Sequence, residues 1–116
     1  MALFTTGLVD NPPVAGVRPS ATVDVLLTND ALLPIDVQIS GYFLAGGSKT
    51  QYVAELFALA PGDVAARNYS TAQFDAFEFE FSITAIGLEI SVWGKDAAGN
   101  LVAAHRLVPA EINLVA

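Results

Sequence analysis

The sequence predicts an all-β fold, an antiparallel β-sandwich of the jelly-roll or Ig-like type with about eight strands. Three observations support this prediction: short apolar segments, alternation of apolar and polar residues within them, and Gly, Pro, Asn and Asp between them. The clearest segment is 77–83, with the sequence FEFEFSI. Because successive side chains of a strand point to opposite faces, this segment has one apolar and one polar face. It is therefore expected to be a half-buried antiparallel strand.

From residue 20 onward, the apolar segments recur at the spacing of a sandwich or barrel. The expected strands cover residues 21–28, 35–44, 50–59, 63–69, 77–84, 88–95 and 100–108, followed by a short terminal segment at 111–115. Turn-forming residues separate them at Asn29-Asp30, Gly46-Gly47, Pro61-Gly62 and 96–100. The segment 50–59 also fits a helical spacing, but the Gly-Gly and Pro-Gly pairs that flank it favour a strand.

Residues 1–19 are expected to form an extended N-terminal arm and connector, and residues 20–116 the β-sandwich domain. The arm contains several residues that prevent a regular helix and interrupt a long ladder. They are Pro12, Pro13, Gly16 and Pro19. Residues 3–9 are apolar enough for a short strand, and residues 10–18 fit an extended connector. A chain of 116 residues without internal repeats is expected to form one domain.

Composition excludes several classes of partner. Twelve acidic residues against five basic ones give a net charge of −7, and an acidic surface repels nucleic acid and anionic lipid heads. Hydrophobic residues make up 53% of the chain and the mean hydropathy is +0.52. The apolar stretches are nevertheless much shorter than the roughly 20 residues of a membrane helix, so no membrane span is expected. The absence of cysteine excludes disulfides, zinc-thiolate sites and thiol catalysis.

The beginning of the sequence has neither a basic n-region nor an apolar run of signal-peptide length. We therefore expect a protein that stays inside the cell, leaves it without a signal peptide, or has been trimmed.

The sequence predicts neither an enzyme nor a cofactor or metal site. His105 is the single histidine and lies in an alternating strand, so a structural role is expected, and no G-x-S-x-G motif provides a nucleophile. Glu78 and Glu80 share one strand face, where carboxylates are usually solvated. Gly46 to Thr50 resembles a phosphate loop only superficially and is expected to be a hairpin turn.

Calcium is the one cofactor that the sequence makes worth weighing, because several oxygen donors lie in turns. These donors are Asp10, Asn11, Asn29, Asp30, Asp96 and Asn100. Turn propensity alone explains all of them, so no bound cation is predicted.

Several large side chains are expected where another chain would cover them. Trp93 is out of phase with the apolar residues of segment 88–92, so it should point away from the buried face, and Tyr42, Tyr52 and Leu26 are similar. The apolar arm could add a strand to a sheet edge, where it gains main-chain hydrogen bonds and side-chain pockets. The predicted subunit interface consists of Leu3, Phe4, Leu8, Val9, Tyr42 and Trp93.

The sequence leaves open whether the arm pairs within its own molecule or with a neighbour. The high apolar fraction favours a neighbour, and residues 11–16 could bridge about 15–20 Å when extended. Such a contact would be head-to-tail and would give either a ring or an open filament.

Four stretches carry a resemblance to a known group of proteins: 5–23 (TTGLVDNPPVAGVRPSATV), 76–79 (AFEF), 90–102 (ISVWGKDAAGNLV) and 104–108 (AHRLV). They resemble the arm, strand and closing-hairpin sequences of small spore-associated proteins of endospore-forming Firmicutes. Related proteins include subunits of endospore appendages, whose jelly-roll or Ig-like domains stack through amino-terminal extensions and edge-strand pairing. Those subunits often carry cysteines in the arm, whereas this chain has none, so any fibre would depend on non-covalent contacts.

The resemblance implies a structural fibre or coat component at the spore surface, released when the mother cell lyses. Its partners would be further copies of itself and other spore-surface proteins. From the residues and the resemblance together, the favoured function is a self-assembling structural subunit that polymerises by arm insertion and edge-strand pairing. The alternative is a carbohydrate- or protein-binding sandwich module in which Trp93, Tyr42 and Tyr52 form the platform.

Overall fold

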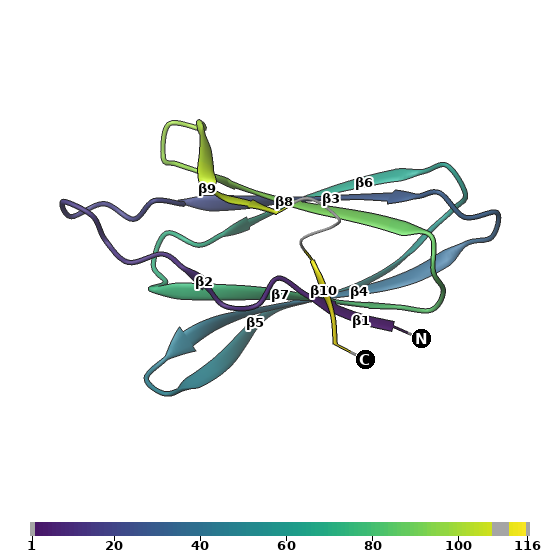
Figure 1. Cartoon of the computed structure of the whole chain (residues 1–116), viewed down its shortest axis with the longest axis horizontal. Helices are drawn as coiled ribbons and strands as arrows, with labels where there is room; N and C mark the ends of the chain where they lie inside the picture. The colour runs from purple at the N-terminus through teal and green to yellow at the C-terminus, as the bar shows by residue number, and fades with distance from the viewer. Residues whose placement is uncertain (1, 108–111, 116) are drawn as a thin grey trace.

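A computed structural model describes residues 2–107 and 112–115, which contain strands and no helix. Two antiparallel sheets pack face to face, so the predicted β-sandwich is confirmed (Figure 1). The first sheet contains β1 (Ala2–Thr5), β2 (Val9–Asp10), β4 (Ile35–Ala45), β5 (Ser48–Leu59), β7 (Ala76–Ile83) and β10 (Asn113–Leu114). The second contains β3 (Thr22–Asn29), β6 (Val64–Ser70), β8 (Leu88–Lys95) and β9 (Leu101–Leu107).

The alternation of side chains located most strands to within one or two residues. Segment 88–95 coincides with β8, and segment 50–59, whose spacing also fitted a helix, lies in strand β5. The arm segment 3–9 forms two strands instead of one, because Gly7 has a φ of 67° and separates β1 from β2. The expected terminal strand is shorter than predicted, and residue 108 of the strand expected at 100–108 and residue 111 of the segment expected at 111–115 lie outside the described residues.

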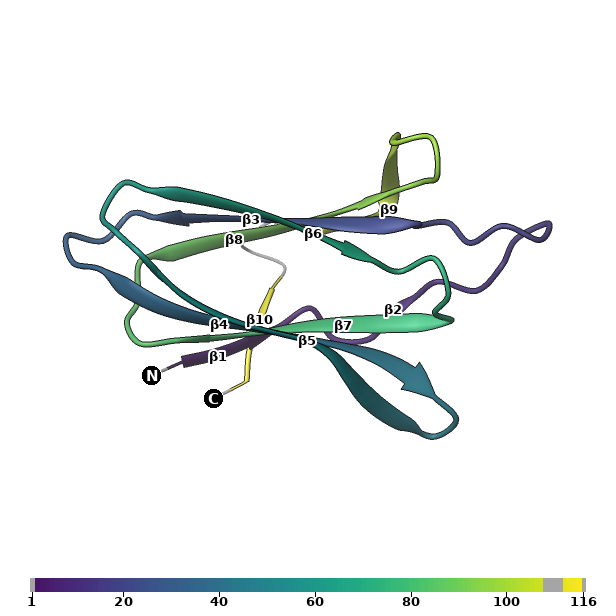
Figure 2. The ribbon, with the colours of Figure 1, turned by 180° about the vertical axis from the view of Figure 1, so that it is seen from behind.

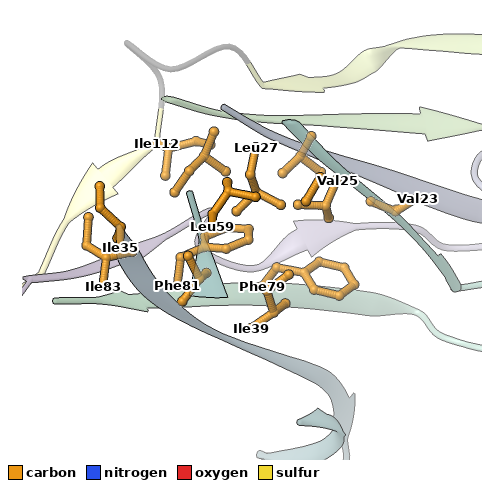
Figure 3. Packing of buried hydrophobic residues seen from close by; sticks show 14 of the residues in the cluster. Val23, Val25, Leu27, Ile35, Ile39, Leu59, Phe79, Phe81, Ile83 and Ile112 are labelled. Carbon is orange, nitrogen blue, oxygen red and sulfur yellow. The ribbon is translucent and has the colours of Figure 1, made fainter. Parts of the chain in front are cut away.

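The core lies between the two sheets and is built from the inward positions of the alternating strands (Figure 3). Phe77, Phe79 and Phe81 of β7 are at most 1% exposed. Full burial of such a side chain contributes about 1.5–3 kcal/mol before the entropy cost of ordering it. The other sheet supplies mainly three residues of β3 and two of β8: Val23, Val25, Leu27, Ile90 and Val92.

The strand order is β10-β1-β7-β4-β5 in the first sheet, with β2 also on β7, and β6-β3-β8-β9 in the second. Only β4–β5 and β8–β9 are hairpins among the connections between β3 and β9, and the chain otherwise crosses from one sheet to the other. The crossings gather the loops at the two ends of the long axis, which measures 47 Å (Figures 1 and 2). Loops 30–34, 60–63 and 84–87 form one end, called the tip end. Segment 11–21 and loops 71–75 and 96–100 form the other, called the connector end.

One long side of the sandwich is closed by side chains that bridge edge strands β5 and β6. The carboxylate of Glu55 accepts hydrogen bonds of 2.6 Å from both Arg67 and Tyr69. The guanidinium of Arg67 also lies 4.4 Å from the ring centroid of Phe57. The opposite long side is therefore the one along which β1, β10 and β9 lie.

Candidate interaction surfaces

The N-terminal arm lies in the sheet of its own molecule. Strand β1 pairs with β7, with Leu3 opposite Ser82 and Phe4 opposite Phe81, and on its other side it pairs with β10. Phe4 faces inward and, with Leu88, Ile90 and Ile112, lines a cavity of about 40 Å³. In the single chain the arm therefore pairs within its own molecule, one of the two arrangements that the sequence leaves open. Without β1, strand β7 would have an unpaired edge beside an apolar interior, and β1 covers both.

The other arm residues of the predicted interface lie in different environments. Leu3 is opposite Ser82 on the outer face of the first sheet and is half-buried. Leu8 is 52% exposed where the arm leaves β7, whereas Val9 pairs with Phe77 and packs against the core. The arm thus buries some of its apolar residues and leaves Leu8 in solvent.

A buried asparagine fixes the connector that follows the arm. The Nδ2 of Asn11 donates to the carbonyl oxygens of Ser20 and Thr71 at 3.0 and 3.1 Å, and its Oδ1 accepts from the Ser20 amide at 2.8 Å. Arg18 donates to the carbonyl oxygen of Asn11 at 3.1 Å and pairs with Asp75 at 2.5 Å. Asn11 is fully buried, so its side chain joins two segments of backbone at the connector end, the connector and loop 71–75.

The single histidine also holds the connector. Nε2 of His105 lies 2.7 Å from the carbonyl oxygen of Asp10, and Nδ1 lies 2.6 Å from Oγ of Ser20. A carbonyl oxygen can only accept, so Nε2 carries a proton and neutral His105 accepts at Nδ1 from the Ser20 hydroxyl. Ser20 is fully buried, so in this arrangement a substrate cannot reach its hydroxyl. The structural role predicted for His105 is confirmed.

The aromatic residues of the predicted platform do not come together. Trp93 lies on the outer face of the second sheet, where its Nε1 donates to Ser91 and the guanidinium of Arg106 is 5.5 Å from its ring centroid. Tyr42 lies on the outer face of the first sheet. Tyr52 packs inward, and its hydroxyl donates to a backbone carbonyl of β6. The prediction of one platform is therefore wrong, because the three rings occupy three separate surfaces.

The two glutamates of β7 are not a solvated pair. Glu78 is 5% exposed and accepts hydrogen bonds from the Thr5 hydroxyl and from Nζ of Lys49, the latter at 2.6 Å. Lys49 also lies 3.7 Å from Glu80. The hydrogen bond to Glu78 raises the pKa of Lys49 above its usual value. Strand β1 on one side and β5 on the other cover this carboxylate, and neither neighbour is adjacent in sequence.

Three of the six oxygen donors considered for calcium have other partners. Asn11 and Asn29 point into the protein, and Asp96 accepts the amides of Ala98 and Asn100 within its own turn. Within residues 2–107 and 112–115, no three acidic or histidine side chains form a cluster that could hold a metal ion. Gly46 and Gly47 form the turn of the β4–β5 hairpin, as predicted.

Among the described residues, the two most exposed large aliphatic side chains lie at the tip end, with a third exposed leucine beside them, and sequence reasoning missed all three. Leu32, Leu33 and Ile86 are 94%, 73% and 85% exposed. Their two loops lie side by side, since the Asp30 amide donates to the carbonyl oxygen of Gly87 at 2.9 Å. The signal was present as two adjacent leucines in a segment outside the expected strands, where apolar residues have no sheet face to cover them.

No protein-family model, curated protein or solved structure matches the chain. In the part of the chain that the structure describes, there is no helix long and apolar enough to cross a membrane.

Proposed function

We propose that the chain is a structural subunit that assembles with copies of itself by exchanging strand β1. The observation that carries this proposal is the position of β1 in a slot between β7 and β10, held by main-chain pairing on both sides. Beyond Thr6, the strand is joined to β2 only through Gly7, with its left-handed φ, and the exposed Leu8. These two residues are a natural hinge for moving β1 into the slot of another copy.

Exchange of an identical strand needs no new interface. A neighbour's β1 would make the same pairing with β7 and place its Phe4 against the same Leu88, Ile90 and Ile112. The balance between closed and exchanged forms then depends on strain at the hinge and on protein concentration. The resemblance to spore-associated proteins leads us to propose a fibre or coat at the spore surface as the product of this assembly.

Because the chain has no cysteine, disulfide trapping can test the exchange cleanly. Leu3 and Ser82 are directly opposite in the β1–β7 register, so cysteines at these positions lie within reach of each other. Leu3→Cys and Ser82→Cys are made as separate proteins, refolded together at high concentration and oxidised. Exchange predicts a disulfide-linked heterodimer on a denaturing gel. The double variant in one chain reports the closed form as an internal disulfide.

The matched control combines Leu3→Cys with Ser40→Cys. Ser40 lies on the same outer face but on β4, across β7 from the arm. If the Leu3–Ser82 mixture gives no more heterodimer than this control while the double variant closes internally, β1 remains in its own molecule and the proposal is wrong.

A second candidate is a carbohydrate-binding module, favoured by a hollow of about 310 Å³ beside Trp93. Leu26 and Val64 supply apolar walls, and Thr28, Glu89 and Ser91 supply polar groups, a mixture that suits a sugar ring. Calorimetric titration with soluble oligosaccharides tests it: binding heat that disappears in Trp93→Ala supports the module. No heat with either protein counts against it.

A further inference from the structure

We propose that a relay of hydrogen bonds latches strand β1 in its slot, and that the positive charge of Lys49 holds this latch closed. The members of the relay, in order, are Lys49 of β5, Glu78 of β7, Thr5 of β1 and the amide of Gly7 at the hinge. The inference rests on the proposed exchange of β1, because it names what controls that step. The latch itself belongs to a single chain, so it can be tested separately from exchange.

The relay is centred on a buried carboxylate. Glu78 is the one acidic side chain that is buried among the described residues, and it lies on the outer face of the first sheet, beneath β1. Nζ of Lys49 donates to one of its carboxylate oxygens at 2.6 Å, and the Thr5 hydroxyl donates to the other. A charge removed from water needs a counter-charge and hydrogen bonds. The burial of Glu78 beneath β1 therefore depends on Lys49.

The hydroxyl of Thr5 connects this carboxylate to the hinge. Because the hydroxyl donates to Glu78, its lone pairs are free to accept, and the Gly7 amide donates to it at 2.9 Å. Hydrogen bonds in such a chain polarise one another, so a charged acceptor at Glu78 strengthens the bond from Gly7. The conformation of the hinge, where Gly7 has a φ of 67°, is thus tied to a side chain of β5, a strand with which β1 does not pair in the described sheet.

Lys49 lies at the surface end of the relay. It follows the turn of the β4–β5 hairpin, and its side chain is 41% exposed. Besides Glu78, its Nζ lies 3.7 Å from Glu80 and 5.1 Å from the ring centroid of Tyr42. One ammonium therefore faces two carboxylates of the same strand face. Without this ammonium, the two carboxylates would repel each other, and one of them would be buried without a counter-charge.

Release of β1 relieves such an unpaired charge. When Thr5 leaves, one side of Glu78 opens to water, and hydration replaces the lost ion pair. The same movement brings water to Glu80, which lies opposite Thr5 in the β1–β7 register. The charge of Lys49 thereby sets how often β1 leaves its slot.

Native-state hydrogen exchange at pH 7 tests the latch in dilute single chains. The Thr6 amide donates to the carbonyl oxygen of Phe79 at 3.0 Å and reports on β1. The Asn11 amide donates to the carbonyl oxygen of Asp75 at 2.7 Å, beyond the hinge, and reports on the rest of the fold. Lys49→Met keeps an unbranched side chain but removes its charge. It should speed hydrogen exchange at Thr6 about tenfold or more and change that at Asn11 less than about twofold.

A second variant distinguishes the charge from the packing of the lysine side chain. Lys49→Met combined with Glu78→Gln removes both charges, and the amide oxygen of the new side chain can accept from Thr5 without a counter-charge. Hydrogen exchange at Thr6 should return to within about threefold of the parent chain. Lys49→Arg, which keeps the charge, should also stay within about threefold.

Lys95→Met is the matched control. Lys95 pairs with Asp24 at 2.5 Å on the second sheet, and its side chain is 35% exposed, but this ion pair does not contact β1. The variant should leave hydrogen exchange at Thr6 unchanged. The proposal is overturned if Lys49→Met leaves exchange at Thr6 unchanged or raises it equally at Asn11. It is also overturned if the double variant stays fast or the control is as fast as Lys49→Met.

The Leu3–Ser82 disulfide assay separates the latch from strand exchange. The two cysteine proteins are mixed in the native state, without refolding, with and without Lys49→Met in both chains. The heterodimer should form about tenfold faster when Lys49 is replaced. Fast hydrogen exchange at Thr6 without any heterodimer would support the latch and contradict strand exchange. A heterodimer that forms equally fast in both backgrounds, with Thr6 unaffected, would support strand exchange and overturn the latch.

Discussion

At the tip end, the side chain of Asn29 ties loop 30–34 to the end of β5 from inside the protein, and at the connector end the side chain of Asn11 ties the connector at Ser20 to loop 71–75. The surfaces above these two asparagines differ. Above Asn29, the loops are short, and Leu32 and Ile86 protrude into solvent. Above Asn11, the long connector folds over the end and leaves a hollow. A buried asparagine can therefore support either a protruding surface or a hollow. The length of the segment that covers the end decides which of the two forms.

Replacing the buried asparagines Asn29 and Asn11 should have the largest effect on the free energy of unfolding. Asn29→Ala and Asn11→Ala each leave several buried backbone groups without a partner, which costs about 1–3 kcal/mol for each group. We expect either variant to lower the free energy of unfolding by about 3 kcal/mol, measured by urea denaturation.

Asn113→Ala is the control, because Asn113 is exposed in β10. It should change the free energy of unfolding by less than about 0.5 kcal/mol. A comparably small effect of Asn29→Ala would show that the tip is not supported from inside.

Each end also contains a glycine at which the backbone lies very close to a neighbouring residue. Replacing these two glycines by alanine should destabilise the fold for different reasons. A Cβ at Gly94 would clash with Oγ of Ser20 and lie 2.6 Å from Cβ of His105. At Gly87, it would lie 2.7 Å from Cβ of Ala31, and φ there is 115°. We expect Gly94→Ala to cost about 1–3 kcal/mol through overpacking. Gly87→Ala adds backbone strain to its clash and should cost at least as much.

Gly47→Ala provides the comparison, since a Cβ at Gly47 would meet no atom within 4 Å beyond its chain neighbours and its φ is not positive. Thermal unfolding of the three variants gives the order. If Gly94→Ala were as stable as Gly47→Ala, the fixed contact between Ser20 and His105 would not constrain the connector end.

The sequence predicted the alternating strands well because alternation is a local property. In segment 77–83 the alternation of apolar and polar residues identifies the buried face directly, and β7 coincides with this segment to within one residue. Glu78 was misread because its burial depends on Thr5 and Lys49, which reach it from distant strands. Composition likewise predicted turns at Asn11 and Asn29 but not the inward direction of their amides, which depends on backbone groups brought from other loops.

The candidate surfaces were predicted less well than the fold. The outward direction of Trp93 followed from its phase on the strand and agrees with the structure. The separation of Trp93 from Tyr42 could not be predicted. The position of a residue in the alternation shows which face of its own strand it occupies, but it does not show to which sheet the strand belongs. The exposed aliphatic side chains of the tip end were missed for a related reason: periodicity carries no information about residues between strands.

The smallest expected effect is on the long side between the two ends. There the bridging side chain is the titratable carboxylate of Glu55, whereas Asn29 and Asn11 at the ends carry neutral amides. The hydrogen bond from Tyr69, with that from Arg67, holds the pKa of Glu55 below its usual value. A depressed carboxyl pKa stabilises the fold at pH values above the unfolded-state pKa, about 4.3, and this stabilisation is lost as pH falls through the folded-state pKa. Tyr69→Phe should therefore lower the free energy of unfolding at pH 7 by less than about 1 kcal/mol, and this difference should shrink near pH 3.

Tyr52→Phe is the matched control for this prediction, because it removes the same hydroxyl from a neutral acceptor. The Tyr52 hydroxyl donates to the carbonyl oxygen of Ser70 at 2.8 Å, and burial raises the pKa of Tyr52 to about 12, so neither group titrates in acid. Its effect on urea denaturation should be the same at pH 7 and pH 3. A Tyr69→Phe difference that stays constant over this range would mean that the Tyr69 hydroxyl does not stabilise the charged form of Glu55, and that apolar contacts, such as the stacking of Tyr69 on Phe79, hold β6 against the first sheet.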